Sequence, residues 1–140
     1  MKKFNLKVIT PKRQIIDEMV ESITLPSKSG EITILANHTS LFSLLVDGIV
    51  KIKNDGQEEF FAIGGGYVET DGKTVSVLVS RAHGQDELDE AAVHEAQDKA
   101  KKIISETTST IERNEAMSAL RRSIIDMKLV SKLKKRAPRA

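Results

Sequence analysis

The sequence contains no cysteine, which excludes disulfide bonds and thiolate metal sites and is typical of a reducing compartment. It also has no run of about 18 uncharged apolar residues, the length that a helix needs to cross a bilayer. The first residues, 1–6, alternate polar and apolar side chains and do not form the apolar core of a signal peptide. We therefore expect a chain that carries neither a secretory leader nor a transit peptide.

Complete motifs of the known enzyme classes are also missing. The three histidines, at positions 38, 83 and 94, are widely scattered, and the zinc-protease-like start at His94 has Asp98 where the second histidine is required. Gly64–Gly66 lacks the further glycine and the Lys-Ser/Thr of phosphate-binding loops, so a bulge or a tight packing corner is the favoured interpretation. No Ser, Asp or Glu stands in a recognisable nucleophile context. We expect no catalytic residue, no metal site and no cofactor.

The small net charge of +2 conceals an asymmetry along the chain. Residues 1–112 hold 13 Lys and Arg against 18 Asp and Glu, whereas residues 113–140 hold nine against two. A basic segment of this kind is attracted to an acidic partner, which can be a protein, a nucleic acid or a lipid headgroup. None of the five aromatic residues lies in the basic segment, so it is poorly equipped to stack on bases. A nucleic-acid-binding module remains the alternative function at this point, and a plain solvated surface remains open as well.

The first 80 or so residues show the two-residue period of strands with one buried face, as in Phe4, Leu6 and Val8. Asp-Gly pairs suit the positive φ angles of tight hairpins, and the pairs at 55–56 and 71–72 lie between alternating runs. The pattern predicts about eight to ten short strands in a β-sandwich or flattened barrel over residues 1–85. No helical interval is long enough for a parallel crossover, so we expect antiparallel sheets.

From residue 86 the apolar spacing becomes helical, and the prediction is an antiparallel two-helix hairpin over residues 86–140. Asp86 is the expected N-cap of the first helix, and Ser109 with Glu112 has the capping-box spacing that begins the second. The residues expected on the packing faces are Leu88, Ala92, Ala96, Ala100 and Ile103 in the first helix and Ala116, Met117, Leu120, Ile124, Met127 and Val130 in the second. A hairpin with so modest an apolar stripe is marginal by itself, so it can either dock on the β domain or detach from it.

Three segments carry a family resemblance that extends over essentially the whole chain. Gly30–Leu41 resembles the Gly-Glu-hydrophobic-Gly-Ile-X-Pro-Gly/Asn-His-Ala-Pro-Leu signature of the epsilon subunit of F-type ATP synthases. Gly65–Glu69 resembles the Gly-Gly-aromatic-hydrophobic-Glu strand start of that family, and Val75–Leu78 followed by Gly84–Ala91 resembles its junction into the helical domain. The order and spacing of all three are those of the family.

The signature segment departs from the family at three of its glycine and proline positions. Thr33, Ala36 and Ser40 stand where the family usually has Gly, Pro and Pro, so the backbone of the loop is expected to differ slightly.

The resemblance implies a ten-stranded N-terminal β-sandwich followed by a helical hairpin, in a non-catalytic central-stalk (rotor) subunit. Such a subunit couples proton translocation to ATP synthesis, and its partners are the gamma subunit, the c-ring and the catalytic beta (and alpha) subunits, with no nucleic acid. The implied location is peripheral, at the cytoplasmic side of a bacterial inner or cell membrane. By match of position, the residues implied to lie in the loop region that faces gamma and the c-ring are Glu31, Asn37, His38 and Leu41.

The resemblance also implies that the C-terminal helices inhibit ATP hydrolysis when their basic residues meet an acidic loop of the beta subunits. The candidates are Arg113, Arg121, Arg122, Lys128, Lys132, Lys134 and Lys135. Some bacterial members bind ATP through a Leu/Ile-Asp-X-X-Arg-Ala motif at the first helix. Leu88 and Asp89 match its start, but Ala92 stands where the arginine belongs, so we expect weak or no ATP binding.

Overall fold

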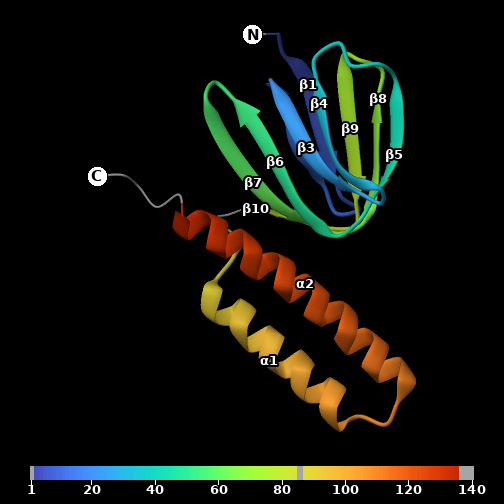
Figure 1. The fold of residues 1–140 in the computed structure, drawn as a ribbon, viewed down its shortest axis with the longest axis vertical. Helices are drawn as coiled ribbons and strands as arrows, with labels where there is room; N and C mark the ends of the chain where they lie inside the picture. Colours follow the sequence, from blue (N-terminus) through green and yellow to red (C-terminus); the bar gives the residue numbers. More distant parts are fainter. Residues whose placement is uncertain (1, 85–86, 136–140) are drawn as a thin grey trace. The chain divides into compact units, whose positions relative to one another are not determined.

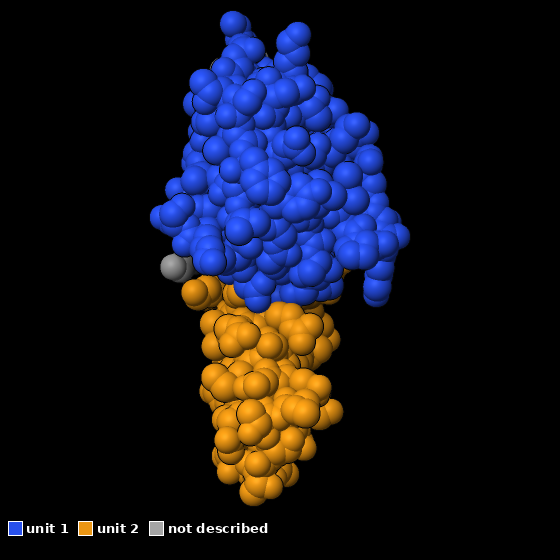
Figure 2. All heavy atoms as spheres, turned by 90° about the vertical axis from the view of Figure 1, so that its right-hand side faces the viewer, with its two compact units in different colours: residues 1–84 blue, residues 85–140 orange. Residues whose placement is uncertain are grey.

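The computed structural model describes residues 2–84 and 87–135, with side chains described as far as residue 132. The chain divides into two compact units, Met1–Gly84 and Gln85–Ala140, which are drawn in blue and orange in Figure 2. The first unit contains all of the strands, and the second contains both helices (Figure 1). No helix of the described ranges is both long enough and apolar enough to cross a membrane.

The first unit is a β-sandwich of ten strands, as predicted. In the sheet the strands follow the order β10-β7-β6-β3-β5-β8-β9-β1-β2, and β4 pairs with β3 (Figure 1). The strands are β1 (Phe4–Ile9), β2 (Gln14–Val20), β3 (Ser22–Ser27), β4 (Gly30–Leu35), β5 (Leu41–Leu45), β6 (Gly48–Asn54), β7 (Gln57–Ile63), β8 (Gly66–Thr70), β9 (Thr74–Val79) and β10 (Ala82–Gly84).

The expectation of purely antiparallel sheets was wrong at one pair. Strands β1 and β9 run parallel, with Leu6 opposite Val75 and Val8 opposite Val77. A helical crossover is required only for parallel strands that follow one another along the chain, whereas β1 and β9 are joined through the intervening strands of the sandwich. No single helical crossover is therefore needed to bring them side by side.

Alternation of apolar residues builds the core of this unit. Every second residue of β1, β3 and β9 is buried, because successive side chains of a strand point to opposite faces of the sheet. Among the residues that the structure describes, the core cluster consists of Phe4, Leu6, Val8, Val20, Ile23, Leu25, Ile34, Leu45, Val50, Ile52, Ile63, Val68, Val75, Val77, Val79 and Ala82. The β unit thus has a hydrophobic core of its own.

The two Asp-Gly turns form as predicted. Asp55 and Gly56 both have positive φ (51° and 77°) in the turn between β6 and β7, which is the backbone geometry of a type I′ hairpin. In the turn between β8 and β9, Gly72 has a φ of 95°, and the Asp71 carboxylate accepts hydrogen bonds from the amides of Lys73 and Thr74, both at 2.9 Å. The amides of Thr74 and Lys73 stabilise the charged carboxylate and lower the pKa of Asp71.

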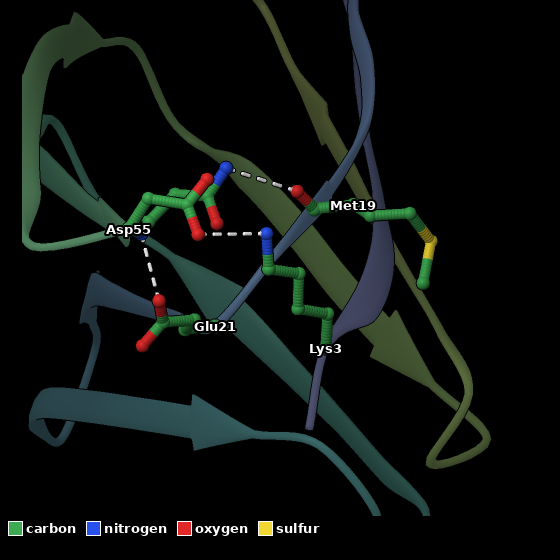
Figure 3. A network of polar contacts seen from close by, with 5 residues as sticks. Lys3, Met19, Glu21 and Asp55 are labelled. Atoms are coloured by element: carbon green, nitrogen blue, oxygen red, sulfur yellow. Dashed lines mark hydrogen bonds and ion pairs between the residues drawn. The ribbon is translucent and has the colours of Figure 1, made fainter. Parts of the chain in front are cut away.

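A polar network links the turn between β6 and β7 to the strands beside it (Figure 3). Lys3 Nζ lies 3.0 Å from Asp55 Oδ1, and the Asp55 amide donates to Glu21 Oε1 at 2.7 Å. The Asn54 side-chain amide donates to the Met19 carbonyl oxygen at 3.2 Å. These contacts join β6 to the segments around β1 and β2, and we assign the network a structural role.

The glycine triplet is a packing corner, as predicted. Gly66 lies between β5 and β9, and a Cβ atom there would overlap the Leu78 carbonyl oxygen and lie 2.7 Å from the Val79 Cα. A Cβ at Gly64 would overlap Ser80 Oγ. The glycines therefore allow strands to approach closely, and they do not form a phosphate-binding loop.

We expect Gly66→Ala to lower the free energy of unfolding by about 3 kcal/mol, the upper range for overpacking, because the obstructing atoms belong to the backbone of β9. For a unit of this size the melting temperature would fall by roughly 12–24 °C. Thermal unfolding followed by circular dichroism measures the change. Gly65→Ala is the matched control, since the nearest atom to its Cβ, the Leu45 carbonyl oxygen, is 3.3 Å away. Equal melting temperatures for the two variants would contradict the prediction.

The second unit is a hairpin of α1 (Glu90–Glu106) and α2 (Thr110–Lys135), which pack side by side in opposite directions (Figure 1). The N-cap of α1 is Asp89, whose carboxylate accepts a hydrogen bond from the Ala91 amide at 3.0 Å. The prediction of Asp86 as the cap was therefore wrong by three residues, and Asp86 itself lies outside the described residues. Ser109 Oγ accepts a hydrogen bond from the Glu112 amide at 3.2 Å, as the capping-box spacing predicted.

The packing faces of the two helices differ in part from the predicted stripes. In α1 the buried residues are Val93 and Ala100, whereas Ala92 and Ala96 are exposed. An alanine face buries little apolar area, so the face with the larger Val93 side chain is favoured. In α2 the residues Met117 and Ile124 are exposed instead of packed, and the buried residues are Ala116, Ser123, Leu129 and Val130.

Candidate interaction sites

The loop between β4 and β5 is held against the turn between β8 and β9. The Asn37 amide donates to the Gly72 carbonyl oxygen at 2.9 Å, and Asn37 has a positive φ of 64°, which asparagine tolerates better than most residues. The backbone amide of His38 donates to the Leu35 carbonyl oxygen at 3.2 Å. The Nδ1 atom of the His38 imidazole donates to the Thr39 carbonyl oxygen at 2.8 Å. Backbone contacts therefore fix the loop, while the Asn37 side chain is exposed.

The structure brings together only three of the four interface residues expected from the sequence. Asn37 and His38 lie in this loop, and Leu41 begins β5 directly after it, half-buried and packed against the core. Glu31 lies on β4, where it pairs with Pro26 of β3, and not in the loop as expected. The end of β4, at Leu35, is four residues further along the extended chain, which places it roughly 13 Å from Glu31. Glu31 is exposed, but it belongs to the opposite end of that strand.

An exposed apolar surface that was not predicted from the sequence lies on β5 and just beyond its end. Phe42 and Leu44 are 61% and 54% exposed, and Val46 just beyond the strand is also exposed. The ring centroid of Tyr67 on β8 lies 5.2 Å from that of Phe42, and Tyr67 is also the strand partner of Leu44. We call Phe42, Leu44, Val46 and Tyr67 the β5 patch. Contiguous exposed apolar side chains of this kind mark surfaces that bind other proteins.

A signal for the β5 patch was present in the sequence. Leu41–Val46 is apolar at five of six positions, so both faces of the strand carry apolar side chains. A strand in a sheet with one solvated face should alternate instead.

The cations expected in the inhibitory arm lie on α2. Arg113, Arg121 and Lys128 are exposed, as are Arg122 and Lys132. Arg113 Nη2 donates to the Thr107 carbonyl oxygen at 2.8 Å, and Arg121 Nη2 donates to Ser118 Oγ at 3.0 Å. Arg122 and Lys132 each have an interaction partner within the chain. The side chains of two further candidates, Lys134 and Lys135, lie outside the described residues.

A groove of about 460 Å³ runs between the two helices. Gln97 lines it from α1, and the lining residues of α2 are Ile124, Met127, Lys128, Ser131 and Lys132. The groove thus combines apolar side chains with a cationic rim.

The predicted start of a nucleotide motif lies at the N-terminus of α1. Asp89 caps α1 through its carboxylate, and Leu88 is half-buried. The described residues also contain no group of three or more His, Cys, Asp or Glu side chains that could hold a metal ion.

The family model for the β-sandwich domain of the ATP synthase delta/epsilon chain matches residues 3–85. The ATP synthase epsilon chain of Psychrobacter sp. (strain PRwf-1) is 33% identical over 132 residues, which cover 94% of this chain and 96% of the relative. The epsilon chain of Caldanaerobacter subterraneus subsp. tengcongensis is also 33% identical, with the same coverage. That of Synechococcus sp. (strain JA-2-3B'a(2-13)) is 34% identical over 79% of this chain and 81% of the relative.

Two solved structures share the fold. A chain in the Euglena gracilis mitochondrial ATP synthase (OSCP/F1/c-ring) superposes with a TM-score of 0.78 at 24% identity, over 94% of this chain and 81% of that one. A chain in the central stalk/c-ring of the Tetrahymena thermophila mitochondrial ATP synthase gives 0.62 at 18% identity, over 91% and 96%. The comparisons do not support the alternative of a nucleic-acid-binding module. This chain belongs to the family of ATP synthase epsilon chains, which are rotor subunits of the F-type ATP synthase stalk and are not themselves catalytic.

Proposed function

We propose that the β unit attaches this chain to the gamma subunit and the c-ring, and that the helical hairpin inhibits ATP hydrolysis. The attachment is supported by the β5 patch, where Phe42 and Leu44 are each more than half exposed. Exposed aromatic and aliphatic side chains on one strand are the kind of surface that a partner protein covers. The attached unit would transmit rotation between gamma and the c-ring and so couple proton translocation to ATP synthesis.

The loop between β4 and β5 supplies the polar part of this interface. Asn37 and His38 precede β5 directly, so the loop and the β5 patch are continuous along the chain. Glu31, at the other end of β4, would contact a partner separately from them. The two structural neighbours belong to an F1/c-ring assembly and to a central stalk/c-ring assembly, which supports partners of this kind.

The hairpin fits the role of an inhibitory arm because of its charge. Residues 113–140 hold nine cations and two carboxylates, and an acidic segment of the catalytic beta (and alpha) subunits is the complementary surface. The seven candidates named from the sequence all fall on or at the end of α2. ATP is not expected to control this arm, because Ala92 supplies no cation for the phosphates and the Asp89 carboxylate caps α1.

We place the chain at the cytoplasmic side of a bacterial membrane, held there through the complex. The relatives named above from Psychrobacter, Caldanaerobacter and Synechococcus are bacterial, which supports this location.

Co-purification with a gamma subunit tests the attachment. We expect gamma to co-purify with a tagged, co-expressed full-length chain through affinity and size-exclusion chromatography, in a one-to-one ratio. The β unit alone, residues 1–84, should do the same, because the residues of its core cluster run from Phe4 to Ala82. A gamma subunit that elutes separately from both forms would contradict the proposal.

A further inference from the structure

Three Asp-Gly pairs occur in the β unit, at residues 47–48, 55–56 and 71–72. Among aspartates, one followed by glycine is the most open to ring closure, in which the next amide nitrogen attacks the aspartate Cγ. Glycine favours this step because it has no side chain beside the attacking nitrogen and because its backbone rotates freely. The three pairs share this chemistry, so the contacts that the fold gives to each pair decide which of them reacts.

The third pair is held at both of its reacting groups. The amides of Thr74 and Lys73 donate to the Asp71 carboxylate and lower the pKa of Asp71. They keep the carboxylate in its charged form, which resists attack by a nucleophile. The Gly72 amide donates to Thr70 Oγ1 at 3.0 Å, and Gly72 is buried. Ring closure at this pair would break all three hydrogen bonds.

The first pair is held through its carboxylate and by close packing. The Gly65 amide donates to Asp47 Oδ1 at 2.8 Å. A Cβ atom on Gly48 would lie 2.8 Å from the Cβ of Pro26, so the backbone at Gly48 is packed against β3. Gly48 also begins β6, where it pairs with Ile63 of β7. Ring closure at this pair would break a hydrogen bond and displace a packed strand.

The second pair lies at the tip of the hairpin of β6 and β7 and is the least constrained. Asp55 and Gly56 are both exposed, and a Cβ atom on Gly56 would have no neighbour within 4 Å. In the described part of the chain the Gly56 amide donates no hydrogen bond. The Asp55 side chain is 73% exposed and contacts Lys3, and an exposed ion pair of this kind contributes little. Both reacting groups of this pair are therefore accessible once the turn opens.

We propose that Asp55 is a site of spontaneous conversion to isoaspartate. The Gly56 amide nitrogen attacks Cγ of the protonated Asp55 carboxyl group and gives up its proton. The carboxyl group gives up its hydroxyl, so one water molecule leaves and a five-membered succinimide ring forms. A second water molecule then opens the ring. Attack at Cγ restores aspartate, whereas attack at the main-chain carbonyl carbon leaves isoaspartate, in which the main chain runs through Cγ. One water leaves and one enters, and nothing is oxidised or reduced.

Isoaspartate at position 55 would loosen the network that joins this turn to the strands beside it (Figure 3). The main chain gains one carbon atom, so the two-residue turn can no longer hold Asn54 opposite Gln57 in the same geometry. The remaining carboxylate is attached directly to Cα and moves away from Lys3 Nζ, and the amide of residue 55 shifts relative to Glu21 Oε1. The inference is independent of the proposed function, because it concerns the stability of the β unit.

The test ages the purified full-length chain at physiological temperature and neutral pH and follows each Asp-Gly pair by peptide mapping. Mass spectrometry with electron-transfer fragmentation distinguishes isoaspartate from aspartate, and a succinimide is detected by the loss of one water. A purified isoaspartate-directed carboxyl methyltransferase, supplied with labelled S-adenosylmethionine, measures the total isoaspartate independently. The same chain aged in urea is the reference, because unfolding removes the contacts that distinguish the three pairs.

We expect Asp55 to convert about tenfold faster than Asp47 or Asp71 in the folded chain, since each of those carboxylates must first lose a hydrogen bond. In urea the three rates should lie within a few-fold of one another. Asp55→Asn should form the ring faster than the unaltered chain and release ammonia, because Asn-Gly suits the same turn. Asp55→Gly is also compatible with this turn and should remove most of the signal.

Two results would overturn the inference. In the first, the three pairs of the folded chain convert at the same relative rates as in urea, so that the fold does not select among them. In the second, Asp55 remains aspartate in the folded chain whatever happens in urea. The melting temperature checks the structural consequence: it should fall as isoaspartate accumulates at position 55 and stay nearly constant in aged Asp55→Gly. A constant melting temperature in the aged, converted chain would contradict the loosening of the network.

Discussion

Replacing Phe42 and Leu44 together by aspartate is expected to abolish stable binding of this chain to gamma while the β unit stays folded. Both side chains point mainly into solvent, so the substitutions remove little from the core. In a complex, however, they would place two carboxylates in the centre of an apolar interface, where unpaired charges are costly. We expect binding to weaken by about 100-fold or more, because a few central aromatic and aliphatic residues supply most of the affinity of an interface.

The measurement is a binding titration with purified gamma, together with thermal unfolding of each variant. Exposed substitutions change the free energy of unfolding by about 0.5 kcal/mol or less, so the melting temperature should stay close to that of the unaltered chain. Met19→Asp is the matched control, because Met19 is a similarly exposed apolar side chain on β2, which does not pair with β5. Normal binding by the double variant would contradict the role of the β5 patch, and loss of binding in the control would show that the effect is not specific to it.

The strands were predictable because one physical rule determines most of them. A strand with one buried face must alternate, and β1, β3 and β9 do so without interruption. The Asp-Gly pairs located the two hairpin turns because a turn of that geometry needs residues that accept positive φ. The parallel pairing of β1 with β9 has no local signal, since it depends on how the whole sandwich closes.

The surface features were harder to predict, because the hydrophobicity of a residue does not indicate what covers it. Phe42 was not distinguishable from a core residue in the sequence, and only the run of apolar residues on both faces of β5 separated it from the other strands. Met117 and Ile124 fitted the same helical stripe as Val130. In the structure, however, Val130 and Ser123 are buried, whereas Met117 and Ile124 are exposed. The position of Glu31, at the far end of β4 from His38, follows from the bounds of that strand rather than from the motif that contains both residues.

The division into two units also changes the interpretation of the charge asymmetry. Residues 1–84 hold ten Lys and Arg against ten Asp and Glu, so the β unit is neutral. The acidic excess lies in residues 85–112, which hold three cations against eight carboxylates and include α1. Within α1 itself, however, four carboxylates stand against three lysines, so this helix is nearly neutral. The hairpin therefore pairs a nearly neutral helix with a basic one.

Removal of residues 86–140 is expected to raise ATP hydrolysis by the reconstituted complex several-fold. The shortened chain keeps every residue of the β-unit core and the whole β5 patch, so it should still fold and still bind gamma. It loses all nine cations of residues 113–140 and with them the surface that is complementary to an acidic segment of the catalytic subunits. ATP synthesis driven by a proton gradient should persist, because rotation is transmitted through the β unit.

The assay compares complexes that contain the full-length chain, the shortened chain or no chain, at equal enzyme concentration. Gamma binding by the shortened chain is measured in the same preparations, so that a loss of attachment is not mistaken for a loss of inhibition. Unchanged hydrolysis with the shortened chain in place would contradict the inhibitory role and leave the coupling role intact. A loss of ATP synthesis despite normal gamma binding would show that the hairpin takes part in coupling, because the β unit alone would then be attached and yet insufficient.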